Sequence, residues 1–177
     1  MLTTYSFIVY PCNGLNLWIK KVVERFRMHL SKPVSTPLDH HTKLSVTQAL
    51  EIVEERSKMD QTPYANGVGS IMYGMVCSKP DLAHAVSMIS RFMGDPGSAH
   101  WVDLKWTLRY LNGSLQAGLR YKKIAHKEAI IGYVDADFVG NVDTRKSLTG
   151  YVFTLYGTAI SWKASQQSVV SLSTIEA

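Results

Sequence analysis

The sequence predicts an α+β fold, with helices in the first two thirds of the chain and a small sheet in the last third. Up to Gly113 the apolar residues recur at the spacing of amphipathic helices. From Ala129 the spacing changes to every second residue, which predicts strands. The 177 residues are 46% apolar and include only two cysteines, which excludes a disordered chain and a disulfide-rich secreted scaffold.

Two helices are predicted before residue 60. Apolar residues follow helical spacing over 17–30, and the Lys32–Pro37 segment then breaks the helix because proline removes a backbone donor. Residues 38–44 are expected to form an extended linker. The Ser-Val-Thr-Gln sequence that follows has the spacing of a capping box, which predicts a second helix over 45–58.

The segment 64–77 is apolar and rich in small residues. Gly67 and Gly69 superficially resemble the start of a dinucleotide-binding loop, but Met72 stands where the third glycine of that motif belongs. We therefore interpret the segment as a buried helix whose small residues allow close packing.

An antiparallel helix pair is predicted next. Ser78 caps a helix with a proline in its first turn, and the Asp95–Gly97 segment ends it. Ser98 is expected to cap the second helix of the pair, which continues to Gly113.

A meander of three strands is predicted after these helices. The first strand begins at Ala129, the second covers Thr149–Tyr156 and the third covers Ala159–Lys163, with a tight turn at Gly157–Thr158. The sequence Ser-Thr-Ile-Glu at 173–176 is a capping-box pattern, which predicts the start of one more helix.

The charge pattern is compatible with a polyanionic partner and equally with a solvated surface. The formal net charge is +5, but the basic residues are scattered along the chain. Lys122, Lys123, Arg145 and Lys146 are the candidates for contacts with nucleic acid. The sequence shows neither an export signal nor a membrane-spanning segment, which predicts an intracellular protein, cytoplasmic or nuclear, without a membrane partner.

Two acids in the first strand could carry chemistry. Asp135 and Asp137 are two positions apart, so their carboxylates emerge from one face with Cα atoms about 6.6 Å apart. Acids within an apolar strand are costly unless something compensates them, and a hard divalent cation is the usual compensation. The alternative is that one or both acids lie at the strand end and face water.

The histidines and serines give weaker indications. His40 and His41 lack a second pair of metal ligands at zinc-like spacing, which favours a solvated loop. His84 and His100 lie beside apolar helix faces and are interpreted as packing or surface residues. No Gly-x-Ser-x-Gly motif is present, so a hydrolase triad is unsupported.

Several motifs resemble one known family. The segments 20–38, 64–114 and 132–177 contain the strings KPVSTPL, SKPDLAHAVSMISRFM, GYVDADF and SLSTIEA. They are similar, in the same order, to the C-terminal part of the Pol polyprotein of copia-type LTR retrotransposons. The resemblance runs from about Asn16 to Ala177 and leaves residues 1–15 unmatched.

The resemblance implies a division of the chain into four parts. Residues 1–15 would be an unmatched leader, and 16–62 the C-terminal tail of a reverse transcriptase with a linker. Residues 63–126 would be a helical connection region. Residues 127–177 would be a truncated RNase H-like domain with a partial, three-stranded antiparallel sheet.

The resemblance also implies a metal site. Asp135 matches the first metal-binding aspartate of RNase H, and Asp137 is its neighbour on the same face. The family's RNase H uses two Mg²⁺ ions, held by several carboxylates, to cleave the RNA strand of an RNA–DNA hybrid.

Two departures from the family predict that this chain has no turnover. The family's active-site glutamate is the second acid of a Ser-Thr-x-Glu-Ala-Glu pattern, and the sequence stops just before it, so Glu176 matches the helix-capping position. One or two carboxylates cannot hold a pair of Mg²⁺ ions tightly. The sequence also lacks the Asp-Asp pair of a polymerase centre.

Two other interpretations remain open. The chain could be a remnant that binds nucleic acid or protein without catalysis, or an unexpressed relic reading frame. The resemblance further implies that the strand carrying Asp135 has one uncovered edge, which predicts association with a complementary Pol segment or poor solubility.

Overall fold

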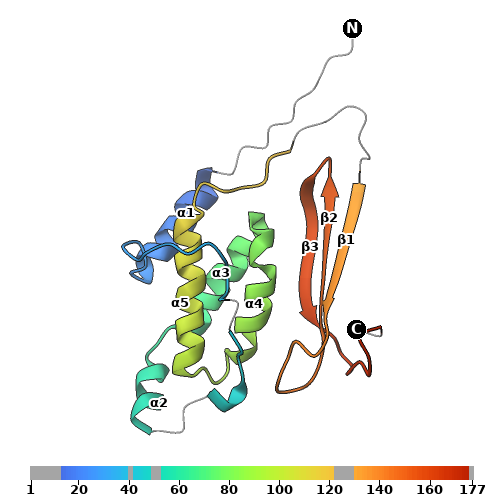
Figure 1. Cartoon of the computed structure of the whole chain (residues 1–177). Coiled ribbons are helices and arrows are strands. Elements are labelled where there is room, and N and C mark those ends of the chain that lie inside the picture. The colour runs from blue at the N-terminus through green and yellow to red at the C-terminus, as the bar shows by residue number, and fades with distance from the viewer. Residues whose placement is uncertain (1–12, 40–41, 49–52, 122–129, 176–177) are drawn as a thin grey trace.

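The computed structural model describes residues 13–39, 42–48, 53–121 and 130–175. Helices gather on one side of the molecule, and a three-stranded sheet stands beside helix α4 (Figure 1). This arrangement confirms the α+β class. The elements are α1 (Asn13–Arg25), η1 (Val46–Gln48), α2 (Val53–Asp60), α3 (Tyr64–Ser78), η2 (Pro80–Leu82), α4 (Ala83–Ile89), η3 (Ser90–Phe92), α5 (Ser98–Gly113), β1 (Ile130–Asp137), β2 (Leu148–Leu155) and β3 (Thr158–Gln166).

The main hydrophobic core lies among α1, α3, α4 and α5. Leu104 of α5 and Val68 of α3 are fully buried there. Gly67 lets the two helices approach closely, because a Cβ atom at this position would lie 2.6 Å from Leu104 Cδ2. The predicted close packing around the small residues of 64–77 is therefore confirmed.

Helix α1 ends earlier than the apolar pattern predicts. The spacing indicates a helix over 17–30, but α1 ends at Arg25. Arg27 has a φ of 57°, and its amide donates to the Glu24 carbonyl at 2.9 Å while the Met28 amide donates to the Val23 carbonyl at 2.9 Å. These two bonds form a Schellman turn that stops the helix. Phe26 and Met28 still pack on the core, so the apolar pattern continues past the helix end.

The antiparallel helix pair is present with different ends. The first predicted helix is divided into η2, α4 and η3, and Ser78 belongs to the end of α3. Lys79 lies between these elements as a buried residue whose Nζ donates to the Ser114 carbonyl at 2.5 Å. Ser98 is the first residue of α5, and the N-cap is Gly97.

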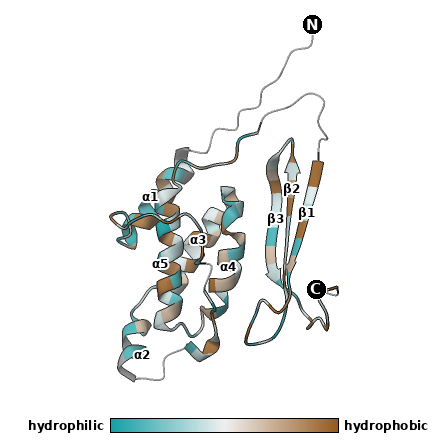
Figure 2. Ribbon diagram, in the orientation of Figure 1, coloured by the Kyte–Doolittle hydropathy of each residue, from teal (hydrophilic) through white to brown (hydrophobic). Residues whose placement is uncertain are grey.

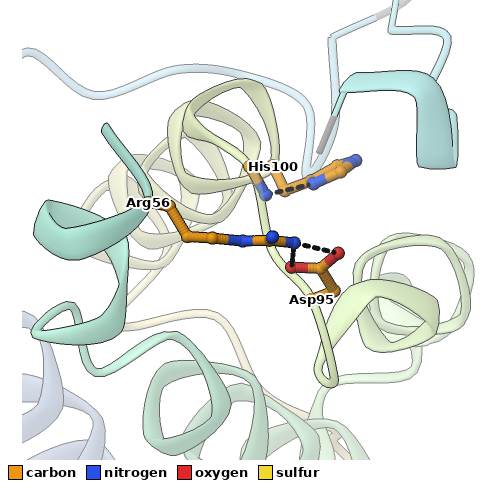
Figure 3. Close-up of polar contacts among 4 residues, drawn as sticks. Arg56, Asp95 and His100 are labelled. Carbon is orange, nitrogen blue, oxygen red and sulfur yellow. Dashed lines mark hydrogen bonds and ion pairs between the residues drawn. The ribbon is translucent and has the colours of Figure 1, made fainter. Parts of the chain in front are cut away.

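His100 anchors the start of α5. Its Nδ1 accepts a hydrogen bond from the Gly97 amide at 2.7 Å, and its Nε2 lies 3.1 Å from the Ser45 carbonyl, to which it donates as the neutral tautomer. Its ring stacks on Phe92 with the centroids 3.9 Å apart. Figure 3 shows His100 near the ion pair of Arg56 and Asp95. The sequence indicates that His100 is a packing or surface residue, and its full burial shows that it is a packing residue.

The environment of His100 predicts that acid destabilises the fold. Burial lowers the pKa of His100, with partial opposition from the Ser45 carbonyl and the carboxylates of Asp143 and Asp95. The unfolded chain then holds this proton more tightly than the folded chain, so the free energy of unfolding falls as the pH drops below about 6.5. A proton on Nδ1 would also break the bond from Gly97.

Urea unfolding followed by circular dichroism across this pH range measures the effect. We expect the slope of the free energy of unfolding against pH to be shallower in His100→Gln, by at most about 1.4 kcal/mol per pH unit for one proton. The readout is the slope, because the substitution also removes the stacking on Phe92. Equal slopes in the two proteins would contradict the prediction.

The predicted meander of three strands is confirmed, in the order β1-β2-β3, with both pairs antiparallel. The turn between β2 and β3 is at Tyr156–Gly157, one residue earlier than predicted, and both residues have positive φ, as a two-residue hairpin requires. β3 faces the helices, and the indole of Trp162 donates to the Met75 carbonyl at 3.2 Å.

Strand β1 lies at the edge of the sheet, and all eight of its residues are exposed. Apolar residues recur along it (Figure 2), including Val134 at 82% and Ile130 at 62% exposure. After β3, residues 172–175 form a bend and a turn, and Glu176 lies outside the described residues. The predicted helix start at Ser173 is therefore not seen in the described part.

Candidate functional site

Asp135 and Asp137 lie on the face of β1 that looks toward the helices. Register places Tyr133 beside Val152, and Val152 beside Trp162, whose indole is bonded to the helical part. Strand alternation puts Asp135 and Asp137 on the same face as Tyr133. Both acids are exposed. The prediction that the two acids share one face is confirmed. Asp137 is also the last residue of β1 and is exposed, in agreement with the alternative that an acid lies at the strand end and faces water.

A cavity of about 620 Å³ adjoins Asp137. One wall consists of α4 residues, including His84 and Met88, and another of residues 36–39 and 42–44. The loop after β1 closes it with Gly140 and Val142. This volume is within the usual range for small-molecule sites.

Gly140 leaves room for the Asp137 carboxylate in the position that it occupies. A Cβ atom at residue 140 would lie 2.4 Å from Asp137 Oδ2, which is closer than any real Cβ contact. The Gly140 amide also donates to the Asp137 carbonyl at 3.3 Å. The chain therefore turns tightly over the acid at the end of β1.

Asp143 fixes the loop after β1 to the helical part. Its carboxylate accepts hydrogen bonds from Ser45 Oγ at 2.5 Å and from the Val46 amide at 3.0 Å. The sequence predicts the local capping pattern of Ser45 and Gln48, and the Ser45 amide indeed donates to Gln48 Oε1 at 3.2 Å. The contact with Asp143 joins residues almost a hundred positions apart, which local patterns cannot show.

Two basic residues of the helical part face the acids, and the sequence interpretation did not place them there. Desolvation lowers the pKa of His84. The Asp137 carboxylate raises this pKa, the Arg91 guanidinium lowers it further, and the Asp135 carboxylate raises it more weakly. Burial also lowers the pKa of Arg91, against the carboxylates of Asp143 and Asp137. Nε and Nη2 of Arg91 are buried without a hydrogen-bond partner among the described residues. His84 and Arg91 are seven positions apart in the sequence, about two helical turns, and this spacing is the only local signal that the two side chains lie on one side.

The carboxylates have the right chemistry for Mg²⁺ but are too few. Asp135 and Asp137 supply the hard oxygen atoms that Mg²⁺ prefers. Among the described residues, however, no group of three or more His, Cys, Asp or Glu side chains could hold a metal ion. The described residues therefore do not make a complete metal site.

The four basic residues predicted to contact nucleic acid are only partly described. Lys122 and Lys123 lie outside the described residues. Arg145 is exposed in the loop between β1 and β2, where its φ is 56° and its amide donates to the Asn141 carbonyl at 2.8 Å. Lys146 is half-buried in the same loop. His40 and His41 also lie outside the described residues.

Comparison with known proteins gives a clear result. The retrovirus-related Pol polyprotein of transposon TNT 1-94 from Nicotiana tabacum is 49% identical over 160 residues, which are 90% of this chain and 12% of that protein. The secreted RxLR effector protein 161 of Plasmopara viticola is 44% identical over 118 residues, which are 67% of this chain and 82% of that protein.

This chain is similar to one segment of copia-type retrotransposon Pol polyproteins. The retrovirus-related Pol polyprotein of transposon RE2 from Arabidopsis thaliana is a further relative, 35% identical over 88% of this chain and 10% of its own length. The chain thus spans about a tenth of the length of these two Pol polyproteins. No protein-family model and no solved structure matches it. Within its described residues, no helix has the length and apolar character needed to cross a membrane.

Proposed function

We propose that this chain is the part of a copia-type Pol polyprotein that joins the end of the reverse transcriptase to an RNase H domain. The whole polyprotein would copy RNA into DNA and cleave the RNA of RNA–DNA hybrids. The observation that carries the proposal is the pair Asp135 and Asp137 on one face of β1, beside a cavity, in a chain with Pol relatives.

In this proposal Asp135 is a magnesium ligand and Asp137 a second, adjacent donor. Bound Mg²⁺ would activate water and stabilise the leaving oxygen in hybrid cleavage. Because the described residues do not make a complete metal site, we propose that the chain alone binds Mg²⁺ weakly and has no turnover. The partners are the hybrid and a further Pol segment that completes the carboxylate set.

A fusion protein tests this function. The chain is extended by the residues that follow the matched region in the tobacco Pol polyprotein, and cleavage of a labelled RNA–DNA hybrid is measured with Mg²⁺. We expect cleavage by the fusion and a loss of at least about a hundredfold in Asp135→Asn, because a metal ligand is removed. Asp60→Asn, at the end of α2, is the matched control and should retain activity.

Two results would contradict the proposal in different ways. A folded fusion without hybrid cleavage would refute the RNase H assignment. Cleavage by the unextended chain, abolished by Asp135→Asn, would refute its inactivity. Full activity of the Asp135→Asn fusion would remove Asp135 from the site.

A further inference from the structure

The cavity beside Asp137 is larger than a metal site requires. Its volume is about 620 Å³, within the usual range for sites that bind small organic molecules. Three parts of the chain form its walls: residues 36–39 and 42–44, the turn η2 with helix α4, and the loop after β1. The proposed hybrid cleavage uses only Asp137 at the edge of this space, so it leaves the rest of the cavity without a role.

Each wall of the cavity carries one acid. Asp39 lies in the 36–39 segment, Asp81 in η2, and Asp137 at the end of β1. Lys43 is the only Lys or Arg among the described residues of the lining. With histidine counted as neutral, three acids and one lysine give this lining a formal charge of −2, opposite in sign to the +5 of the whole chain. The cavity therefore attracts cations.

The three acids do not converge on one point. Among the described residues, no group of three or more His, Cys, Asp or Glu side chains could hold a metal ion, although three acids line this cavity. A single compact ion therefore cannot serve all three walls. A longer cation, whose positive charges are separated, fits this arrangement.

The remainder of the lining is mainly apolar and suits an alkyl chain. Two leucines come from the first wall, two residues from α4 and two valines from the loop after β1: Leu38, Leu44, Ala85, Met88, Val139 and Val142. Contact with these side chains removes an alkyl chain from water, which favours binding. The cavity thus combines separated negative charges with an apolar surface.

The walls are held in place without a ligand. The Thr107 hydroxyl of α5 donates to the Pro37 carbonyl at 3.0 Å, which fixes the first wall. The Tyr110 hydroxyl, from the same helix, donates to the Asp81 carboxylate. Asp143 holds the loop after β1 through its bonds to the Ser45–Val46 segment. A site formed in advance loses little free energy to ordering when a ligand binds.

Two of the acids have capacity for a further hydrogen-bond donor. Neither Asp81 nor Asp137 belongs to an ion pair within the described part of the chain. The bond from Tyr110 uses one acceptor position of Asp81, and an ionised carboxylate has about four. An ammonium group offers three donors, and such charge-assisted bonds are stronger than neutral ones.

We propose that this cavity binds an aliphatic diamine, with one ammonium group at Asp137, the other at Asp81 and the alkyl chain along the apolar lining. A metal dication carries the same charge but lacks the length and the apolar surface. A monoamine has the chain but reaches only one acid. This binding site is independent of whether the chain takes part in hybrid cleavage.

Isothermal titration calorimetry with putrescine, a four-carbon diamine, tests the site. The full chain is titrated in a low-salt buffer without Mg²⁺, and we expect one putrescine per chain. Asp81→Asn should weaken binding by at least about tenfold, because a charge-assisted bond is lost. The asparagine oxygen can still accept the bond from Tyr110. Butylamine, with one ammonium group, should also bind at least about tenfold more weakly than putrescine.

A second variant tests the cavity without removing an acid. Val142→Lys places a cation on the cavity wall and should weaken putrescine binding, because it repels the ligand. Val102→Lys adds the same charge on the surface of α5, outside the cavity lining, and should leave binding unchanged. Thermal unfolding shows whether each variant is folded.

Asp60→Asn is the matched control for the lost acid. Asp60 is the last residue of α2 and does not line this cavity, so its replacement should leave putrescine binding unchanged. Equal weakening in Asp60→Asn and Asp81→Asn, or equal affinity for butylamine and putrescine, would overturn the proposal. So would the absence of binding at millimolar putrescine. Because the titration contains neither Mg²⁺ nor hybrid, diamine binding and hybrid cleavage can fail separately.

Discussion

Replacing Leu104 with alanine is expected to lower the free energy of unfolding by about 2–5 kcal/mol, the usual cost of a cavity at a buried leucine. Leu104 is fully buried in the core of the helical part, and its Cδ atoms press against Gly67. Urea unfolding followed by circular dichroism measures the effect. Val102→Ala is the control on the same helix and should change stability by less than about 0.5 kcal/mol, because Val102 is exposed.

A second substitution makes this prediction specific to the α3–α5 contact. Gly67→Ala alone should cost about 1–3 kcal/mol, because its Cβ would overlap Leu104 Cδ2. In the Leu104→Ala background the obstructing atoms are gone, and the new methyl group fills part of the cavity. The double variant should therefore be more stable than the sum of the single changes predicts. Strict additivity would contradict the proposed packing.

The exposed edge strand predicts self-association, and Val134→Lys should reduce it to a monomer. The outer edge of β1 has no strand partner among the described residues, and an exposed apolar edge is a template for pairing with another chain. Val134 is the most exposed large apolar residue of β1. A lysine there places a charge in any continuous sheet formed by two copies. Sedimentation velocity measures the distribution of species.

Val102→Lys is the matched control for this effect. It adds the same charge at an exposed valine of α5, away from the sheet, and should leave association unchanged. A monomeric unmodified chain with cooperative unfolding would contradict the prediction. If Val134→Lys and Val102→Lys reduce self-association equally, the added net charge and not the strand edge is responsible.

The elements with strong periodicity could be predicted from the sequence, and so could the shared face of the two acids. Alternation in β1 is a local property, so it places Asp135 and Asp137 together before any tertiary contact is known. The end of α1 could not be predicted in this way. Phe26 and Met28 continue the apolar spacing, because they pack on the core from a turn, and only the φ of Arg27 shows that the helix has ended.

The surroundings of the acids depend on tertiary structure. His84 lies near Asp137 because α4 packs against the sheet, and no spacing in the sequence connects a helix to that strand end. In the same way, the hydrogen bond from the Arg109 side chain to the Lys32 carbonyl spans 77 positions of the sequence.

The hydrogen bonds between Asp143 and the Ser45–Val46 segment limit which parts of the chain can be exchanged by recombination or by engineering. The strand supplies the carboxylates, but the loop that borders them is held by a segment encoded far upstream. A recombinant that receives the sheet without that segment would keep Asp135 and Asp137 and lose the support of their neighbouring loop. Recombination between related coding sequences should therefore preserve this loop only when the Asp143 loop and the Ser45–Val46 segment come from the same parent.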